Sequence, residues 1–209
     1  MELWSGVLSN NATKVRIALA EKGLDATVHN LDWTRANAWG EKPSAFLEVS
    51  PRGEVPVLID DGLVIHDSTV INEYLEERYP TPALMPQDVR SRTLCRLWED
   101  EADHLANTAN ATLIAKVFVG GNPEDPEAAD ARAQLDHWQA RLSRQLGDGD
   151  YVCGAFSLAD IASFMTLAVA LTLGASEGPA NVRTWYERML TRPAIKQEYD
   201  AMMSAAAAA

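Results

Sequence analysis

Cysteine is scarce in this chain of 209 residues: only Cys95 and Cys153 occur, and they form no Cys-x-x-Cys pair. This scarcity excludes a disulfide-rich scaffold and favours two reduced thiols inside a core. The four histidines lack metal-ligand spacing, and the sequence contains no nucleophile elbow, phosphate-binding loop or zinc pattern. We therefore expect no metal, and we expect any chemistry to act on a thiol that a ligand brings to the protein.

Basic residues and long apolar runs are also few. The chain has 18 Lys and Arg against 30 Asp and Glu, a formal net charge of −12, whereas a nucleic-acid surface needs basic stripes and an anionic membrane repels such a charge. The longest mostly apolar stretch, residues 161–175, is too short to span a bilayer. The first residues lack the basic residues and apolar block of a signal peptide. We expect a cytoplasmic protein whose partners are neither nucleic acids nor membranes.

The apolar content of 47% is ample for the core of one large domain or two small ones. Residues 1–79 carry, in order, a strand, a helix ended by Gly23, a second strand, a hairpin and a helix. That order predicts a mixed sheet covered by helices. Residues 80–87 are rich in proline and predict a linker, whereas residues 88–209 carry only helical patterns.

The helical part shows its own boundaries. Residues 89–119 form one long helical pattern, and a second helix is expected over about residues 126–146. Ser157 and Asp160 form a capping-box pattern, with Asp in place of the usual Glu, that predicts the start of an apolar helix.

Residues 49–80 hold the most informative pattern. Val55-Pro56 lies at a turn that leads into an apolar strand, and Asp60-Asp61-Gly62 is a hairpin signal. Proline cannot donate to a strand ladder, and cis peptide bonds occur before proline in tight turns. A helix then opens on Asp67-Ser68. Its unpaired N–H groups suit a carboxylate, and Asp67 suits an ammonium on the same ligand, although such residues also cap helices routinely.

This stretch closely resembles the glutathione-site half of the glutathione transferase family, and weaker likenesses at residues 151–160 and 185–193 extend the resemblance over essentially the whole chain. The resemblance implies an α/β N-terminal thioredoxin-like domain (βαβ–ββα) at residues 1–79 and an all-α helical C-terminal domain at residues 88–209. It also implies glutathione as co-substrate, a small electrophilic substrate in a pocket to which the helical domain contributes, and a homodimer.

The resemblance assigns binding roles to particular residues. The backbone of Val55, before Pro56, would pair with the cysteinyl part of glutathione like an added strand. Asp67 and Ser68 would receive the γ-glutamyl end. Lys42 aligns with a lysine that meets the glycine carboxylate in some members of the family.

The expected chemistry is activation of a thiol. The thiol of glutathione is mostly protonated at neutral pH, and the thiolate is the nucleophile. Making the thiolate the major form takes roughly 30-fold, or about 2 kcal/mol. A hydroxyl that donates to the sulfur supplies about 1.5–3 kcal/mol, and the positive start of a helix adds about 0.3–1 kcal/mol. The two together suffice without a metal or a histidine base.

Two residues are candidates for this contact. Serine-type members of the family place a catalytic hydroxyl six residues before the valine of the first helix, which here is Ser9. A bacterial Nu-type branch has Thr-Pro-Asn at this place, so that Asn11 matches an asparagine implicated in the sulfur contact. This chain departs from both patterns because Asn10 stands where proline is usual. Ser9 and Asn11 are also residue types that cap helices well.

The leading hypothesis is a glutathione transferase, active in detoxification, in which the glutathione thiolate attacks an electrophilic carbon. Reduction of disulfides or peroxides is an alternative that Asn11 favours, and the run Asp67-Ser68-Thr69-Val70-Ile71 resembles bacterial ether-cleaving relatives. A non-enzymatic binding module of the same fold is a third possibility, because Asn10 and Glu54 depart from the family's usual residues.

Overall fold

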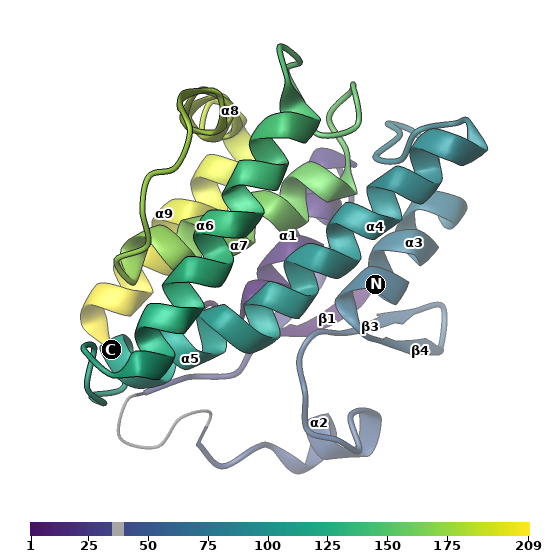
Figure 1. Cartoon of the computed structure of the whole chain (residues 1–209). Helices are drawn as coiled ribbons and strands as arrows, with labels where there is room; N and C mark the ends of the chain where they lie inside the picture. The colour runs from purple at the N-terminus through teal and green to yellow at the C-terminus, as the bar shows by residue number, and fades with distance from the viewer. Residues whose placement is uncertain (35–39) are drawn as a thin grey trace. The chain divides into compact units, whose positions relative to one another are not determined.

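The computed structural model describes residues 1–34 and 40–209, and these residues divide into two compact units (Figure 1). The first unit comprises Met1–Leu84 and Pro193–Ala209, and the second comprises Met85–Arg192. Sequence pattern alone groups residues 193–209 with the helical part. In the structure they form helix α9 (Pro193–Ala208), which packs on the first helix of the first unit.

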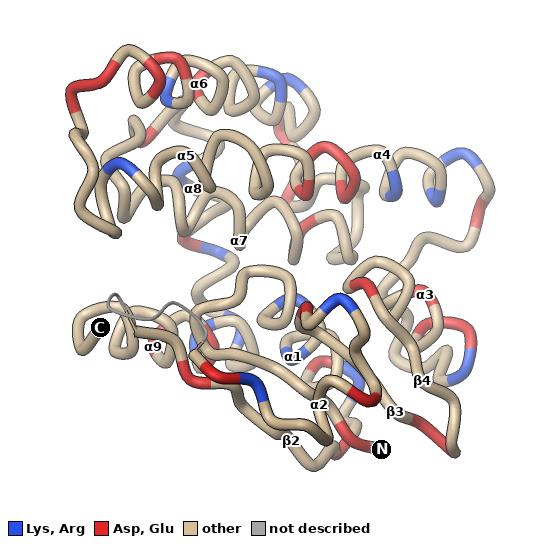
Figure 2. Tube along the Cα trace, turned by 90° about the horizontal axis from the view of Figure 1, so that it is seen from below, with Lys and Arg blue, Asp and Glu red and all other residues tan. Residues whose placement is uncertain are grey.

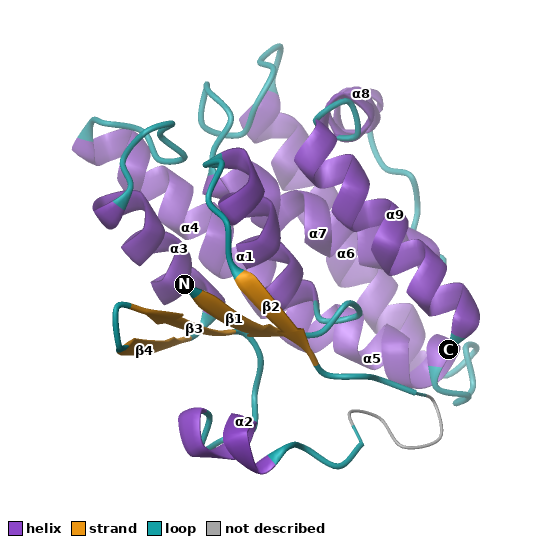
Figure 3. Ribbon diagram, turned by 180° about the vertical axis from the view of Figure 1, so that it is seen from behind, coloured by secondary structure: helices purple, strands orange, loops and turns teal. Residues whose placement is uncertain are grey.

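The first unit is built on a four-stranded mixed sheet in the order β2-β1-β3-β4. β1 and β2 are parallel, whereas β1–β3 and β3–β4 are antiparallel. Helices α1 and α3 cover one face of this sheet, and α2 lies on the other (Figure 3). The predicted thioredoxin-like βαβ–ββα order is therefore confirmed. The elements are β1 (Glu2–Ser5), α1 (Asn10–Glu21), β2 (Thr27–Asn30), α2 (Ser44–Val49), β3 (Val57–Asp60), β4 (Leu63–His66) and α3 (Ser68–Arg78).

Local sequence explains where these elements begin and end. α1 ends at Glu21, and Gly23 follows with a φ of 62°, the left-handed conformation that glycine adopts without a Cβ penalty. The α2 face of the sheet has a small apolar core made of Leu31, Phe46 and Val57. Trp4 packs against this core and stacks on His29, with ring centroids 4.7 Å apart.

The second unit is helical. The predicted helix over residues 89–119 is present, but two π-helical segments interrupt its α-helical hydrogen bonding. The predicted helix over residues 126–146 has the expected bounds. The elements are α4 (Val89–Leu105), η1 (Ala106–Asn110), α5 (Ala111–Leu113), η2 (Ile114–Phe118), α6 (Pro126–Leu146), α7 (Leu158–Thr172) and α8 (Ala180–Met189). The predicted two-part architecture, α/β followed by helices, is confirmed.

The predicted capping box opens α7. The Asp160 carboxylate accepts hydrogen bonds from the Ser157 amide (3.0 Å), the Val152 amide (2.9 Å) and Trp185 Nε1 (2.9 Å). Desolvation by burial is the main reason that the pKa of Asp160 rises to about 6, although these hydrogen bonds oppose the rise. The buried Asp160 carboxylate thus links α7, α8 and the loop before α7 through its hydrogen-bond donors.

The remaining features concern charge, metals and membranes. Figure 2 shows that basic positions lie in the first part of α4 and acidic positions in its last part. Over residues 1–34 and 40–209, no group of three or more His, Cys, Asp or Glu side chains is arranged to hold a metal ion. Within the same ranges, no helix combines the length and the apolar character needed to cross a membrane. Cys95 is buried and Cys153 half-buried, and both are free thiols.

Candidate functional site

The sheet register brings three chain segments to one end of the first unit. Val57, the first residue of β3, pairs with Trp4 of β1 on one side and with His66 of β4 on the other. Because both neighbouring strands run antiparallel to β3, their carboxyl ends lie beside its first residue. The loop after β1, the turn before β3 and the start of α3 after β4 therefore emerge together. These segments carry Ser9, Val55-Pro56 and Asp67-Ser68, the residues that the sequence singles out.

Ser9 is the N-cap residue of α1. Its Oγ accepts a hydrogen bond from the Ala12 amide at 3.3 Å, and its amide donates to the Gly6 carbonyl at 3.0 Å. Accepting from Ala12 uses an oxygen lone pair and leaves the hydroxyl proton for another partner. Capping and donation to a ligand are thus compatible in the same side chain. α1 has no acidic residue in its first turn, so no carboxylate there offsets the positive helix end.

Asn10 and Asn11 occupy the first two positions of α1. Proline is well suited to the first position of a helix, but α1 of this chain begins at Asn10 without one. The Oδ1 atoms of both asparagines are buried and have no hydrogen-bond partner among the residues that the structure describes. Buried polar atoms are nearly always paired in proteins, so these two oxygens are positions where a donor group of a ligand would supply the missing hydrogen bond.

Val55-Pro56 forms the turn before β3, and the peptide bond between the two residues is cis. The Val55 side chain packs on the apolar core of the α2 face. Neither its N–H nor its C=O makes a hydrogen bond to any described residue. Ser50 holds the preceding loop, because its Oγ donates to the Glu54 carbonyl (2.9 Å) and accepts from the Glu54 amide (3.0 Å). Ser50 therefore fixes the loop at Glu54, whereas the main-chain N–H and C=O of the next residue, Val55, have no hydrogen-bond partner among the described residues.

Lys42 lies against this loop. A Cβ placed on Gly53 would be 3.0 Å from Lys42 Nζ. The Lys42 ammonium group therefore lies beside Gly53, which is two positions before Val55 in the sequence. Gly53 has a φ of 66°, which favours glycine. The Glu54 side chain is exposed and pairs with Arg52 at 3.3 Å, so it points to solvent.

Asp67 caps α3, as one interpretation of the sequence predicts. Its Oδ1 accepts from the Thr69 amide at 2.9 Å and from the Val70 amide at 3.2 Å, bonds that do not involve Oδ2. Asp67 has a φ of 71°, a conformation that costs a non-glycine residue on the order of 1–3 kcal/mol and that clusters at functional sites. Ser68 beside it is buried. The Asp67 carboxylate, two positive helix ends and Lys42 together suit a ligand that carries both carboxylates and an ammonium group.

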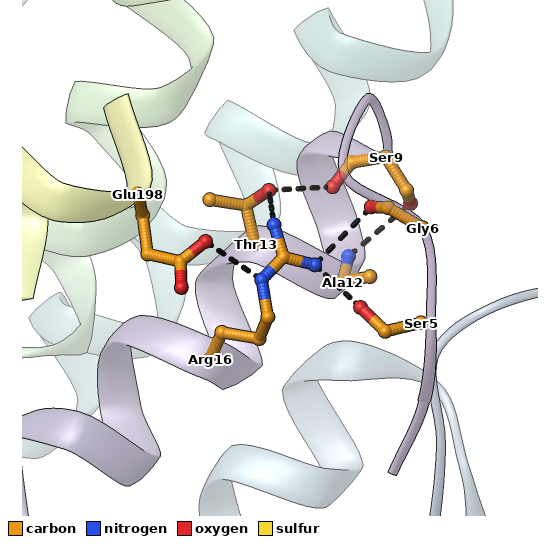
Figure 4. A network of polar contacts seen from close by, with 7 residues as sticks. All are labelled: Ser5, Gly6, Ser9, Ala12, Thr13, Arg16 and Glu198. Carbon is orange, nitrogen blue, oxygen red and sulfur yellow. Dashed lines mark hydrogen bonds and ion pairs between the residues drawn. The ribbon is translucent and has the colours of Figure 1, made fainter. Parts of the chain in front are cut away.

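A polar network that the sequence did not reveal supports the Ser9 loop (Figure 4). Arg16 of α1 donates to Ser5 Oγ, to the Gly6 carbonyl (3.1 Å) and to Thr13 Oγ1 (2.7 Å). Its Nε pairs with Glu198 Oε2 at 2.6 Å. Arg16 reads in the sequence as one more polar residue on a helix, and Glu198 is 182 positions away, so no sequence signal links the two.

The chain is similar in sequence to known proteins. The sequence profile described as "Glutathione S-transferase, N-terminal domain" matches residues 4–83. A maleylacetoacetate isomerase from Pseudomonas aeruginosa is 31% identical over 212 residues, covering 96% of each chain. A stringent starvation protein A homolog from Coxiella burnetii is 43% identical over 97 residues, but this match covers only 46% of the present chain and 44% of that relative.

A solved structure is similar over nearly the full length. It is a theta class glutathione S-transferase from Xanthomonas axonopodis pv. citri with glutathione bound, and it has a TM-score of 0.81 and 26% identity. The similarity covers 95% of the present chain and 96% of that one.

Proposed function

Since the chain belongs to the glutathione S-transferase family, we propose that it binds glutathione at the β1–β3–β4 end of its sheet and promotes attack of the glutathione thiolate on a small electrophile. The observation that carries this proposal is the unpaired main chain of Val55 between two helix N-termini. An extended tripeptide bound beside that edge gains main-chain hydrogen bonds in the manner of an added strand.

The charged groups suit the rest of the tripeptide. The N–H groups at the start of α3, with Ser68, suit the γ-glutamyl carboxylate, and Asp67 suits its ammonium. Lys42 beside Gly53 suits the glycine carboxylate. Each end of glutathione thereby meets a group of complementary charge.

Activation of the sulfur is the part assigned to Ser9. Its hydroxyl proton is available for donation, because the cap bond to Ala12 uses only a lone pair. One such charge-assisted hydrogen bond, worth about 1.5–3 kcal/mol, with about 0.3–1 kcal/mol from the start of α1, covers the roughly 2 kcal/mol that thiolate formation requires. Asn11, one residue into the helix, is the second group proposed to contact the sulfur.

A pair of substitutions separates capping from activation. Ser9→Ala removes both the cap and the donor, whereas Ser9→Asp keeps a good cap but only accepts hydrogen bonds once ionised. We expect both variants to lose the ultraviolet thiolate band of bound glutathione at neutral pH, while only Ser9→Ala loses about 1 kcal/mol of stability. Ser204→Ala, at an exposed position of α9, is the control. A thiolate band that persists in Ser9→Asp contradicts the proposed role of Ser9.

A second candidate reaction is isomerisation of maleylacetoacetate, which is the activity named for the full-length relative from Pseudomonas aeruginosa. This reaction and conjugation are distinguished by product: glutathione is consumed in conjugation and recovered unchanged in isomerisation. Disulfide or peroxide reduction, which Asn11 favours, is distinguished by formation of glutathione disulfide.

A binding module without catalysis is the candidate from a different class. The name of the Coxiella burnetii relative states no reaction, and Asn10 and Glu54 depart from the usual family residues. Tight binding of glutathione with no thiolate band would favour this function over catalysis. We further propose a cytoplasmic homodimer, and a particle of 22.9 kDa in sedimentation at micromolar concentration would contradict the dimer.

A further inference from the structure

Arg16 has no described contact with Ser9, yet it contacts the Gly6 carbonyl and the Thr13 hydroxyl, which both hydrogen-bond to the Ser9 main chain (Figure 4). The Thr13 amide also donates to the Ser9 carbonyl at 2.9 Å, the ordinary first hydrogen bond of α1. The Gly6 carbonyl accepts from the Ser9 amide at 3.0 Å and from Arg16 Nη1 at 3.1 Å. The Thr13 hydroxyl donates to the Ser9 carbonyl at 2.9 Å and accepts from Arg16 Nη2 at 2.7 Å. The guanidinium therefore hydrogen-bonds to the acceptor of the Ser9 amide, which is the Gly6 carbonyl, and to one donor of the Ser9 carbonyl, which is the Thr13 hydroxyl.

Arginine also sets the direction of these hydrogen bonds. A guanidinium donates and never accepts, so the Thr13 hydroxyl must accept from Arg16 and direct its single proton to the Ser9 carbonyl. Ser5 Oγ is likewise held as an acceptor from Arg16. Because Arg16 spans several acceptors with a planar fork, a lysine would keep the charge without reproducing this geometry.

Glu198 orients the guanidinium. The Arg16 and Glu198 side chains are only 10% and 16% exposed, and the Nε–Oε2 distance is 2.6 Å. Glu198 lies on α9, the helix that returns to the first unit from the far end of the chain. A largely buried ion pair thus connects the last helix of the chain to the loop that carries Ser9.

We propose that Arg16, oriented by Glu198, is a positioning residue that holds the Ser9 hydroxyl where it donates to the glutathione sulfur. This role rests on the proposed function of Ser9. The role makes α9 part of the support of the site, because Glu198, which is 182 positions after Arg16 in the sequence, orients the side chain that holds the Ser9 loop. Arg16 acts through Ser9, not as a charge that attracts the thiolate directly.

The experiment is a double-mutant cycle on the full chain. The pKa of the thiol of bound glutathione is measured from its thiolate absorbance at saturating glutathione, for Arg16→Lys in the native background and in Ser9→Ala. We expect Arg16→Lys alone to raise the pKa of the bound thiol by about 1. At a pH below that pKa, this change lowers the thiolate fraction roughly tenfold. In the Ser9→Ala background we expect Arg16→Lys to add no further change, because a positioning residue acts only while its target is present.

Glu198→Gln gives a second variant whose sign distinguishes the two mechanisms. If the network positions Ser9, the weaker glutamine contact raises the pKa of the bound thiol. If Arg16 acts as a charge, removal of its counter-ion lowers that pKa. Asp200→Asn is the matched control, because Asp200 lies on the same helix in an exposed pair with Lys196 at 2.7 Å, and we expect it to leave the pKa of the bound thiol unchanged.

The possible results separate failure of this inference from failure of the proposed function. An equal Arg16→Lys effect in both backgrounds, no effect in the native background, or a lowered pKa in Glu198→Gln overturns the positioning role while leaving Ser9 as activator. If native protein shows no thiolate band, or Ser9→Ala leaves the band intact, the function proposed for Ser9 fails, and the positioning role fails with it. Thermal unfolding of each variant confirms that the chain remains folded.

Discussion

The contact between Lys42 and Gly53 provides a test of the role proposed for Lys42 at the glycine end of glutathione. In Gly53→Ala, the new Cβ would lie 3.0 Å from Lys42 Nζ and 3.3 Å from Lys42 Cδ. Gly62 in the β3–β4 hairpin is a matched control, because its φ is 80° and a Cβ there meets nothing within 4 Å. The two substitutions share the backbone effect and differ in the contact with Lys42.

The expected loss of stability is nearly the same in the two variants. A left-handed conformation costs an L-residue about 1–2 kcal/mol, and both glycines have positive φ. The extra contact at Gly53 involves chiefly the far end of a flexible lysine side chain, which moves aside at little cost. We therefore expect the free energies of unfolding, measured by urea denaturation, to fall by about 1–2 kcal/mol in each variant and to differ by less than about 0.5 kcal/mol.

The expected change in binding is different. If Lys42 pairs with the glycine carboxylate as proposed, its displacement from Gly53 breaks that ion pair. A solvent-exposed ion pair is worth up to about 1 kcal/mol, which corresponds to about fivefold in Kd. Calorimetry should show weaker glutathione binding to Gly53→Ala and unchanged binding to Gly62→Ala. Binding of γ-glutamylcysteine, which lacks the glycine, should not distinguish Gly53→Ala from Gly62→Ala.

Three results would refute this reasoning. Equal glutathione affinity in the two variants would show that Lys42 does not meet the ligand. An equal weakening of γ-glutamylcysteine binding by Gly53→Ala would assign the effect to the Val55 edge instead. A stability loss much larger in Gly53→Ala than in Gly62→Ala would show that the lysine cannot move aside.

Further predictions concern the fold around the site. Lys22→Met removes the ammonium group that pairs with buried Glu76 at 2.7 Å, so urea denaturation should show a loss of about 3–5 kcal/mol in the free energy of unfolding, and Lys22→Met with Glu76→Leu should recover most of it. Asp160→Ala leaves its buried amide and indole donors unpaired and should lower the free energy of unfolding by more than about 3 kcal/mol; a loss under about 1 kcal/mol would contradict the role of the capping box. Burial alone would raise the pKa of Asp60, but hydrogen bonds from Tyr79 and Tyr74 hold it below its usual value. Because the folded pKa is depressed, Asp60 contributes stability above about pH 4 that is lost as pH falls through the folded pKa. Unfolding measured between about pH 5 and 2.5 should therefore be less pH-dependent in a Tyr79→Phe variant, and an unchanged slope would refute this assignment.

Local chemistry was sufficient for the elements that carry the site. The turn at Val55-Pro56, the hairpin at residues 60–62 and the helix opening at Asp67-Ser68 are each set by residues within a few positions of one another, and the structure has all three. The same applies to the Ser157–Asp160 capping box. Turn and cap preferences depend on a few neighbouring dihedral angles and side chains, so they can be recognised in the sequence.

Other features depend on which segments meet in three dimensions. The sequence does not show that Trp4, Val57 and His66 share one register, that Lys42 lies on Gly53, or that α9 returns to α1 through the Arg16–Glu198 pair. It also predicts one uninterrupted helix where π-helical turns occur at residues 106–110 and 114–118. Thus the amino-acid pattern alone determined the family resemblance, the order of elements and the candidate residues, because these follow from local propensities. Tertiary packing decided what supports Ser9 and what borders Val55, because those contacts join residues that are distant in the chain.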